Sequence, residues 1–252
     1  MTDERQTYQA PALERGLEIL ERLATLGGPA TLAEMGRELG RSRSELFRMF
    51  VVLERGGYLS RVDGDRYALT SKLYDVALRA PPQRDLIDAA LPAMHRTAVR
   101  LQQSCHLGVA SGTDLVVAAR VESPDMLGFS LRVGFRRPLN LSASGRVLYA
   151  YQSAGIRMTW RSLANTPEDA ERWQEVEAAA QAVLDNGHYI TPSFYVDAVT
   201  DVVAPIIPEG RSYAVATLVV PFISGQSTRT TLDEVATCVM EEAATIGRGL
   251  ML

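Results

Sequence analysis

The chain has 252 residues, 46% of them hydrophobic and 22% charged, which is enough to bury a core and excludes an intrinsically disordered protein. Its formal net charge of −4 argues against strong non-specific binding to nucleic acid. Cys105 and Cys238 match neither a disulfide framework nor a zinc motif, and no stretch is apolar enough for a secretory signal or a membrane helix. We therefore expect a cytoplasmic protein without a membrane partner.

The amino-terminal residues 1–10 carry no hydrophobic pattern and are predicted to form a disordered arm. Pro11, a residue favoured in the first turn of a helix, then opens a predicted helix over about 12–26. Apolar side chains recur at helical spacing along one face of this helix: Leu13, Leu17, Leu20 and Ala24. This pattern is typical of a helix that packs against a core.

Two shorter helices are predicted over 31–39 and 43–55, with Gly40 where the first of them must end. Each begins with a capping box, in which each side chain accepts a hydrogen bond from the other residue's backbone N–H. The two boxes are Thr31 with Glu34, and Ser42 with Glu45.

A hairpin follows these helices. Its strands are predicted at Tyr58–Arg61 and Arg66–Thr70, joined by a two-residue turn at Asp63-Gly64. The order helix, turn, helix, hairpin predicts a winged helix-turn-helix domain over 11–70. Such a unit typically places one helix in the major groove of DNA.

The polar side chains of helix 43–55 that lie off its apolar stripe are candidates for reading DNA. Arginine pairs with guanine edges and serine with phosphate or base, whereas the alternative is a solvated helix face. Phe47 would either touch a thymine methyl group or pack under the hairpin. The hairpin arginines would reach the DNA backbone or the minor groove, or pair with Asp63 and Asp65 as surface ions. The predicted DNA-binding set is Thr31, Arg41, Ser42, Arg43, Ser44, Phe47, Arg48, Arg61 and Arg66.

The chain after the hairpin begins with a predicted helix over 71–80, which the Pro81-Pro82 pair interrupts. We therefore predict a linker helix within 71–83 and a domain boundary at the proline pair. The remaining residues, 84–252, alternate in a way that indicates an α+β domain built on an antiparallel sheet. Helices are expected over 84–103, 143–151, acidic stretches through 184, and 229–249. Strands are expected over 104–111, 114–121, 127–133, 187–193, 199–207 and 213–221.

The segment Asn140–Gly145 places small polar residues just before a predicted helix, whose free N–H groups favour an anion. The alternative is ordinary helix capping by Ser142 or Ser144. A G-x-S-x-G nucleophile is excluded, because Ser142 stands where glycine is required. His106 has no partner at metal-ligand spacing and is either a satisfied core histidine or a pocket group. The sequence therefore predicts no catalytic residue, no metal and no cofactor.

Several blocks of the sequence resemble the IclR family of bacterial transcriptional regulators, along essentially the whole chain. They are ALERGLEIL at 12–20, LERGGYLSR within the helix-turn-helix, RVESPDMLGFSLRVGFRRPLNLSASGRVLYA at 120–150, NGHYITPSFYVDAVTDVVAPI at 186–206, and the closing helix. The resemblance implies a winged helix that binds double-stranded, palindromic operator DNA as a homodimer or a dimer of dimers. It also implies a GAF-like effector-binding domain over 84–252, and a repressor or activator controlled by a small organic or aromatic acid.

The resemblance further implies where that effector would sit, against one face of the sheet. Departures from common family patterns at Asn140 and Asp201 argue against a small keto acid, and nearby aromatic residues favour an aromatic or larger polar ligand. The predicted ligand-binding set is His106, Phe129, Leu131, Val133, Asn140, Ser142, Ala143, Ser144, Gly145, Tyr189, Tyr195 and Asp201. The alternatives are a protein-interaction module, a ligand sensor that does not bind DNA, or an enzyme with an accessory helix-turn-helix.

Overall fold

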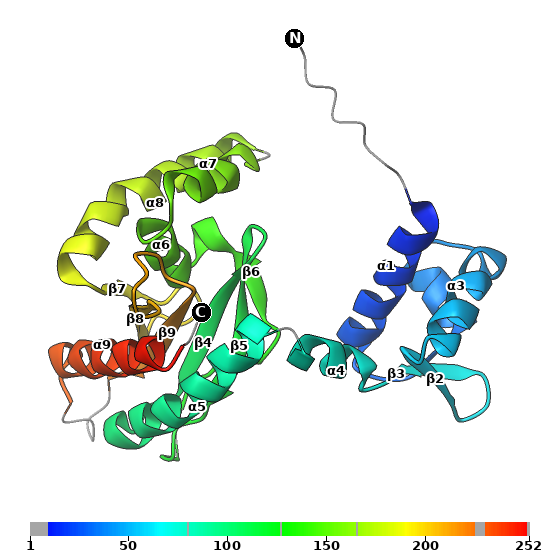
Figure 1. Ribbon diagram of the computed structural model, residues 1–252, viewed down its shortest axis with the longest axis horizontal. Coiled ribbons are helices and arrows are strands. Elements are labelled where there is room, and N and C mark those ends of the chain that lie inside the picture. The colour runs from blue at the N-terminus through cyan, green and yellow to red at the C-terminus, as the bar shows by residue number, and fades with distance from the viewer. Residues whose placement is uncertain (1–9, 80, 127, 165, 225–229, 251–252) are drawn as a thin grey trace, which may run out of the picture. The chain divides into compact units, whose positions relative to one another are not determined.

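The computed structural model describes residues 10–79, 81–126, 128–164, 166–224 and 230–250 (Figure 1). The chain divides into two compact units, residues 1–81 and 82–252, so the division falls within the Pro81-Pro82 pair. The arm predicted over 1–10 lies, apart from Ala10, outside the described residues. None of the helices in the described residues is long and apolar enough to cross a membrane.

The amino-terminal unit is a winged helix-turn-helix, as predicted. Its strands form an antiparallel sheet in the order β1-β3-β2. Its elements are α1 Pro11–Leu26, β1 Ala30–Thr31, α2 Leu32–Glu38, α3 Arg43–Arg55, β2 Leu59–Val62, β3 Arg66–Leu69 and α4 Lys72–Arg79.

Both predicted capping boxes are confirmed, at the starts of α2 and α3. Thr31 donates its backbone N–H to the Glu34 carboxylate at 2.7 Å, and the Glu34 N–H donates to the Thr31 hydroxyl at 3.2 Å. Gly40 has a φ of 61°, the left-handed conformation that the turn between the two helices requires. Short-range signals therefore set the start of α3, the helix that carries four of the nine predicted DNA-binding residues.

The buried face of α1 differs from the prediction. Ile19, Leu20 and Leu23 are buried against α2 and α3, whereas Leu13 and Leu17 are 63% and 51% exposed. Helical spacing groups Leu13 with Leu17 and Leu20, but the face that meets the other helices is rotated and shares only Leu20 with that stripe.

The hairpin turn is one residue longer than predicted. Val62 pairs with Arg66, which leaves a loop of three residues, 63–65. Asp63 and Gly64 both have positive φ, 47° and 88°, as their residue types favour. The turn residues Asp63 and Gly64 were therefore predicted correctly, whereas the pairing register of the two strands was not.

The carboxy-terminal unit carries its helices on both faces of one antiparallel sheet. Its first helix begins at Pro81 rather than at residue 84, because proline is tolerated at the first helical position, where no N–H is needed. Its elements are α5 Pro81–Leu101, β4 Cys105–Ser111, β5 Asp114–Val121, β6 Arg136–Pro138, the 3₁₀ turn η1 Leu139–Leu141, α6 Ala143–Ala150, α7 Ala154–Ser162, α8 Pro167–Asn186, β7 Tyr189–Pro192, β8 Val199–Ile206, β9 Ala216–Ile223 and α9 Leu232–Arg248.

The sheet has the strand order β6-β5-β4-β9-β8-β7, with α5 and α9 on one face and α6, α7 and α8 on the other (Figure 1). The strand predicted over 127–133 is wrong: residue 127 lies outside the described residues, and 128–133 form no strand. Gly134 and Phe135 take the edge of β5 instead, through hydrogen bonds with Val117 of 2.8 and 3.0 Å. Residues 128–133 are therefore free to lie beside the sheet face.

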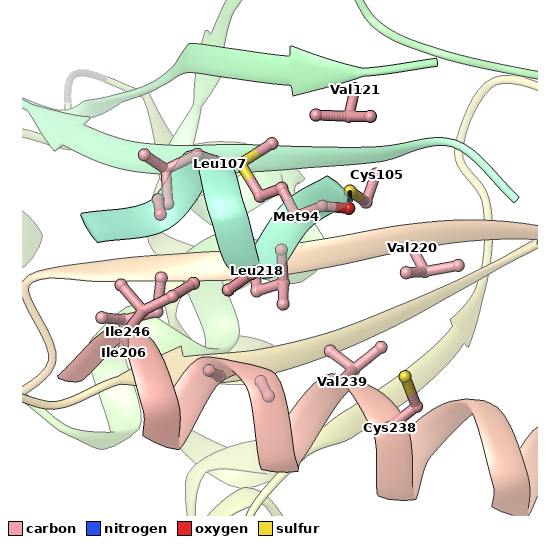
Figure 2. Close-up of a cluster of buried hydrophobic side chains, with 14 of the residues drawn as sticks. Met94, Cys105, Leu107, Val121, Ile206, Leu218, Val220, Cys238, Val239 and Ile246 are labelled. Atoms are coloured by element: carbon pink, nitrogen blue, oxygen red, sulfur yellow. Dashed lines mark hydrogen bonds between the residues drawn. The ribbon is translucent and has the colours of Figure 1, made fainter. Parts of the chain in front are cut away.

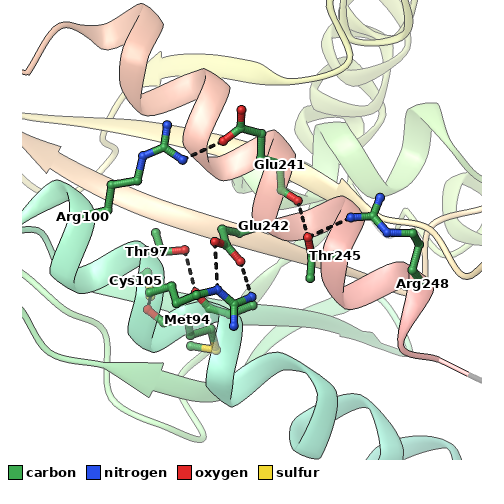
Figure 3. Close-up of polar contacts among 10 residues, drawn as sticks. Met94, Thr97, Arg100, Cys105, Glu241, Glu242, Thr245 and Arg248 are labelled. Atoms are coloured by element: carbon green, nitrogen blue, oxygen red, sulfur yellow. Dashed lines mark hydrogen bonds and ion pairs between the residues drawn. The ribbon is translucent and has the colours of Figure 1, made fainter.

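Apolar packing holds α9 and α5 against their face of the sheet. Leu107, Leu218 and Val239 are buried in this cluster, which Figure 2 shows between the strands and α9. Two ion pairs join the helices at the surface: Arg96 to Glu242 and Arg100 to Glu241, each at 2.6 Å (Figure 3). The Arg100 pair is exposed on both sides and contributes little, whereas Arg96 holds the mostly buried Glu242 carboxylate through two hydrogen bonds. Burial of the apolar side chains carries most of the stabilisation.

Candidate functional sites

The amino-terminal unit has an open hollow between α3 and the hairpin. It brings together five of the residues predicted to contact DNA, from the first two turns of α3 and from β2. The hollow is lined by Leu32, Arg43, Ser44, Phe47, Arg48, Arg61, Asp65 and Tyr67.

The arginines of α3 are open to solvent. Arg43 and Arg48 are exposed and form no ion pair with any described residue. Phe47 is 52% exposed, so it does not pack under the hairpin. The face of α3 therefore presents two exposed cations, without an ion-pair partner in the described part of the chain, beside an apolar ring.

The hairpin arginines have partners other than the aspartates considered from sequence. Arg61 pairs with Glu54 at 3.3 Å and lies over the Tyr67 ring, 5.2 Å from its centroid. Arg66 donates a hydrogen bond to the backbone carbonyl of Pro29 and does not line the hollow.

Three other predicted DNA-binding residues also lie outside the lining of the hollow. The hydroxyls of Thr31 and Ser42 are used in the capping boxes. Arg41 is exposed just before α3 begins.

The carboxy-terminal unit encloses a cavity between the sheet and the amino-terminal end of α6. Its volume is about 30 Å³, which holds little more than a water molecule. Residues from β4, β8 and β9 form its floor, and residues 129–137 and 193–195 close it. The cavity is lined by His106, Leu115, Phe129, Leu131, Phe135, Arg137, Ser142, Ala143, Ser144, Ser193, Phe194, Tyr195, Asp201 and Val219.

The structure brings eight of the predicted ligand-binding residues to this cavity: His106, Phe129, Leu131, Ser142, Ala143, Ser144, Tyr195 and Asp201.

Four predicted residues do not line it. Gly145 allows the close approach of η1, because an added Cβ would lie 1.8 Å from the Leu139 carbonyl oxygen. Asn140 turns towards α8, with its amide nitrogen 3.4 Å from Asp169. Val133 is 59% exposed, and Tyr189 lies near Arg146 instead.

The predicted ligand-binding set lacks six residues that line the cavity: Leu115, Phe135, Arg137, Ser193, Phe194 and Val219. Of these, Phe194 was among the aromatic residues expected near the ligand, and Ser193 lies in the segment 189–203 that was expected to form a wall. Strand alternation could have found Val219, because it pairs with His106 across the β4–β9 ladder and so shares its face. No local pattern marks Arg137, whose strand is only three residues long.

Arg137 belongs to an aromatic roof over the cavity. Its guanidinium lies 4.8 Å from the ring centroid of Phe194 and 4.5 Å from that of Tyr195. The Phe135 ring meets Tyr195 edge to face, with centroids 5.6 Å apart. These contacts join the β6 edge to the segment between β7 and β8, which closes the cavity on that side.

The hydroxyls at the start of α6 are already in use. Ser142 caps the helix by accepting the Gly145 N–H at 2.9 Å, and it donates to the Leu139 carbonyl at 3.1 Å. Thr217 donates to the Ser144 hydroxyl at 2.9 Å. Capping by Ser142 therefore occurs, while the first N–H groups of the helix still point towards its amino-terminal end, where the cavity lies.

Two ionisable groups on the floor are shifted by burial. Burial raises the pKa of Asp201 to about 6, although a hydrogen bond from Ser193 and the charge of Arg137 both act to lower it. Burial lowers the pKa of His106 to about 4, so its imidazole is neutral at pH 7. Within the described chain, the His106 Nδ1 atom has no hydrogen-bond partner.

The described residues contain no group of three or more His, Cys, Asp or Glu side chains that could hold a metal ion.

Comparisons with known proteins assign both units. The IclR helix-turn-helix domain matches residues 12–63, and the carboxy-terminal domain of the bacterial transcriptional regulator IclR matches residues 79–158. The chain is 29% identical over 157 residues to the probable transcriptional regulator SauR of Cupriavidus necator, a match that covers 62% of each chain. It is 27% identical over 122 residues to the regulator KdgR of Dickeya chrysanthemi, covering 48% of this chain and 40% of KdgR. The chain thus spans less than two thirds of either relative.

A solved structure has the same fold. It is an IclR homologue from Microbacterium hydrocarbonoxydans complexed with 4-hydroxybenzoate, 22% identical, with a TM-score of 0.77. The alignment covers 94% of this chain and 98% of that one.

Proposed function

Because the chain belongs to the IclR family of bacterial transcriptional regulators, we propose that it is a ligand-responsive DNA-binding regulator. The observation that carries this proposal is the exposed face of α3, where Arg43 and Arg48 lie open to solvent beside the hairpin. A separate unit that encloses an aromatic-walled cavity supports control by a small molecule.

The DNA-binding half of the proposal assigns α3 to the major groove. Arg43 and Arg48 contact guanine edges there, and Phe47 meets a thymine methyl group. Arg61 of the hairpin contacts the phosphate backbone. The protein acts as a homodimer or a dimer of dimers on a palindromic operator, with half-sites about one helical turn apart or a multiple of it.

The effector half of the proposal assigns an aromatic acid to the cavity. The neighbouring structure holds 4-hydroxybenzoate, and the rings of Phe129, Phe135 and Phe194 offer apolar walls here. The carboxylate is bound by Arg137 and by the free N–H groups at the start of α6. Since a 30 Å³ cavity cannot hold a benzene ring, binding displaces the roof.

Displacement of the roof supplies the step that couples effector to operator. An effector that binds one arrangement of the unit more tightly shifts the population towards it and changes the spacing of two winged helices. The proposal requires no catalytic residue, metal or cofactor, in keeping with curated relatives that are named as regulators. It places the protein in the cytoplasm, where operator DNA lies.

The test is a footprint of the purified protein on the region upstream of its own gene. A protected palindrome, with affinity that falls steeply as salt rises, is the expected result. Arg48→Ala should lower the affinity for that site about 5- to 100-fold, because a bidentate base contact is worth roughly 1–3 kcal/mol.

The matched control is Arg55→Ala, which removes an exposed arginine from the same helix but from outside the hollow. It should bind like the wild type. No protection at low salt, with or without benzoate, would contradict DNA binding and favour a protein-interaction module.

A further inference from the structure

His106 is a buried polar side chain whose hydrogen bonding is incomplete. It extends from β4 to the floor of the cavity and is only 3% exposed. Its Nδ1 atom finds no partner among the described residues. Buried polar atoms are nearly always paired in folded proteins, so an unpaired one on a side chain that lines a cavity points to a missing ligand group.

The other unpaired buried atoms do not belong to this cavity. In the described chain they are the Oδ1 atom of Asn140 and the Nη1 atom of Arg146, and neither residue lines it. Arg146 lies within 3.7 Å of Glu175, and Asn140 turns towards Asp169.

Most of the other polar side chains of the cavity already have partners, and the Tyr195 phenol belongs to the aromatic roof rather than to the floor. Ser142 caps α6, and Ser144 accepts from Thr217. Asp201 accepts from Ser193 and faces Arg137, which stacks on the aromatic roof. His106 is therefore the side chain on the floor that holds a buried hydrogen-bonding atom with no partner among the described residues.

The charge state of His106 selects the kind of group that it can bind. Because its pKa is held at about 4, its imidazole offers neutral hydrogen bonding at pH 7. A carboxylate at this point would either be buried beside an uncharged ring or have to draw a proton onto a buried imidazole, and both are costly. A hydroxyl group suits the site better, since it donates to Nδ1 and carries no charge.

We propose that His106 is the specificity-determining contact for a hydroxyl group on the aromatic acid effector. This inference rests on the proposed function, in which Arg137 and the start of α6 hold the carboxylate. The preferred ligand class is a hydroxy-substituted aromatic monoacid. Unsubstituted benzoate leaves Nδ1 unpaired, and an aromatic diacid places a second charge on the floor.

The test is calorimetric titration of the full-length protein with benzoate, 3-hydroxybenzoate, 4-hydroxybenzoate and terephthalate. The better of the two hydroxybenzoates should bind about fivefold to tenfold more tightly than benzoate, and terephthalate more weakly than either. In His106→Phe this preference for the hydroxyl group should disappear, while benzoate still binds. His106→Gln, which keeps a side-chain acceptor, should retain part of it.

His95→Phe is the matched control, because His95 is exposed on α5 and does not line the cavity. It should keep the preference unchanged. Nitrogen NMR of the imidazoles in the wild-type protein gives a second readout. It needs no variant, so it holds even if His106→Phe fails to fold. The His106 Nδ1 resonance should move on addition of the preferred hydroxybenzoate and much less on addition of benzoate.

The outcomes separate this inference from the function on which it rests. Equal affinities of the wild type for benzoate and both hydroxybenzoates would overturn the role of His106 and leave the effector class standing. A hydroxyl preference that survives in His106→Phe would assign the hydroxyl to another group. Binding of none of the four acids would overturn the aromatic acid effector itself, and this inference with it.

Discussion

The two candidate sites are built in opposite ways. The hollow of the amino-terminal unit takes four of its eight lining residues from positions 43–48 of α3, three from the hairpin that follows, and Leu32 from α2. The cavity of the carboxy-terminal unit draws its lining from residues as far apart as His106 and Val219. The first site is largely a product of local chain geometry, whereas the second exists only when the sheet, α6 and two connecting segments are all in place.

The sites also treat charge differently. Arg43 and Arg48 remain in water, where an unpaired charge is tolerated and is available for a polyanion. Arg137 lies against two rings and Asp201 is largely buried, so each perturbs its surroundings. Arginine is therefore a solvated surface charge in one unit and a side chain packed against aromatic rings in the other.

The largest expected effect tests whether the two sites depend on separate units. Gly145→Ala places a Cβ 1.8 Å from the backbone oxygen of Leu139, which cannot rotate away. Overpacking against backbone should destabilise the carboxy-terminal unit by about 3 kcal/mol or more. Thermal unfolding followed by circular dichroism should show an early transition for this unit, with the winged helix retained.

Gly155→Ala is the control for that substitution, since nothing lies within 4 Å of its added Cβ in α7. It should stabilise by up to about 1 kcal/mol through helix propensity. A single transition that shifts for both units in Gly145→Ala would show that the units unfold together.

A smaller effect tests the buried charge. Burial raises the pKa of Asp201 from 3.8 to about 6 in the folded protein, so its ionisation is unfavourable there. Well below pH 4 the group is neutral in both the folded and the unfolded states and has no effect. As pH rises from about 4 to about 6 the carboxyl ionises first in the unfolded state, so the folded protein loses stability, by up to about 3 kcal/mol and less where water reaches the carboxylate, and the loss is complete above pH 6.

Asp201→Asn should therefore be more stable than the wild type at pH 7.5 and equal to it near pH 4. Urea unfolding of both proteins across this range measures the difference. A stability difference that does not change with pH would show that the carboxylate is well solvated.

The smallest effect concerns the hairpin. Arg61→Ala should weaken operator binding about threefold across all sequences and reduce the salt slope by about 1, because a phosphate contact carries no sequence information. Fluorescence anisotropy at several salt concentrations measures both quantities. Glu54→Gln, which removes the partner of Arg61, should strengthen binding slightly. Weakened binding in both variants would mean that the ion pair acts by shaping the hairpin.

Much of the amino-terminal unit could be predicted from short stretches of sequence. The capping boxes at Thr31 and Ser42, the turn at Gly40 and the positive φ at Asp63 and Gly64 all follow from neighbours within a few residues. Such signals work because a cap or a tight turn satisfies its own backbone groups locally. The order of helices and the antiparallel sheet follow for the same reason, from hydrophobic period and turn chemistry.

Tertiary packing decided the rest. Contacts between distant segments decided three features of the structure. They are the buried face of α1, the register of the hairpin, and the position of residues 128–133 beside the sheet. Two features of the cavity also depend on such contacts. They are the packing of Arg137 in the aromatic roof and the lack of a partner for the Nδ1 atom of His106 among the described residues. A residue's own neighbours in the chain set its backbone conformation, but burial and pairing depend on which other elements reach it, and those contacts exist only in the assembled fold.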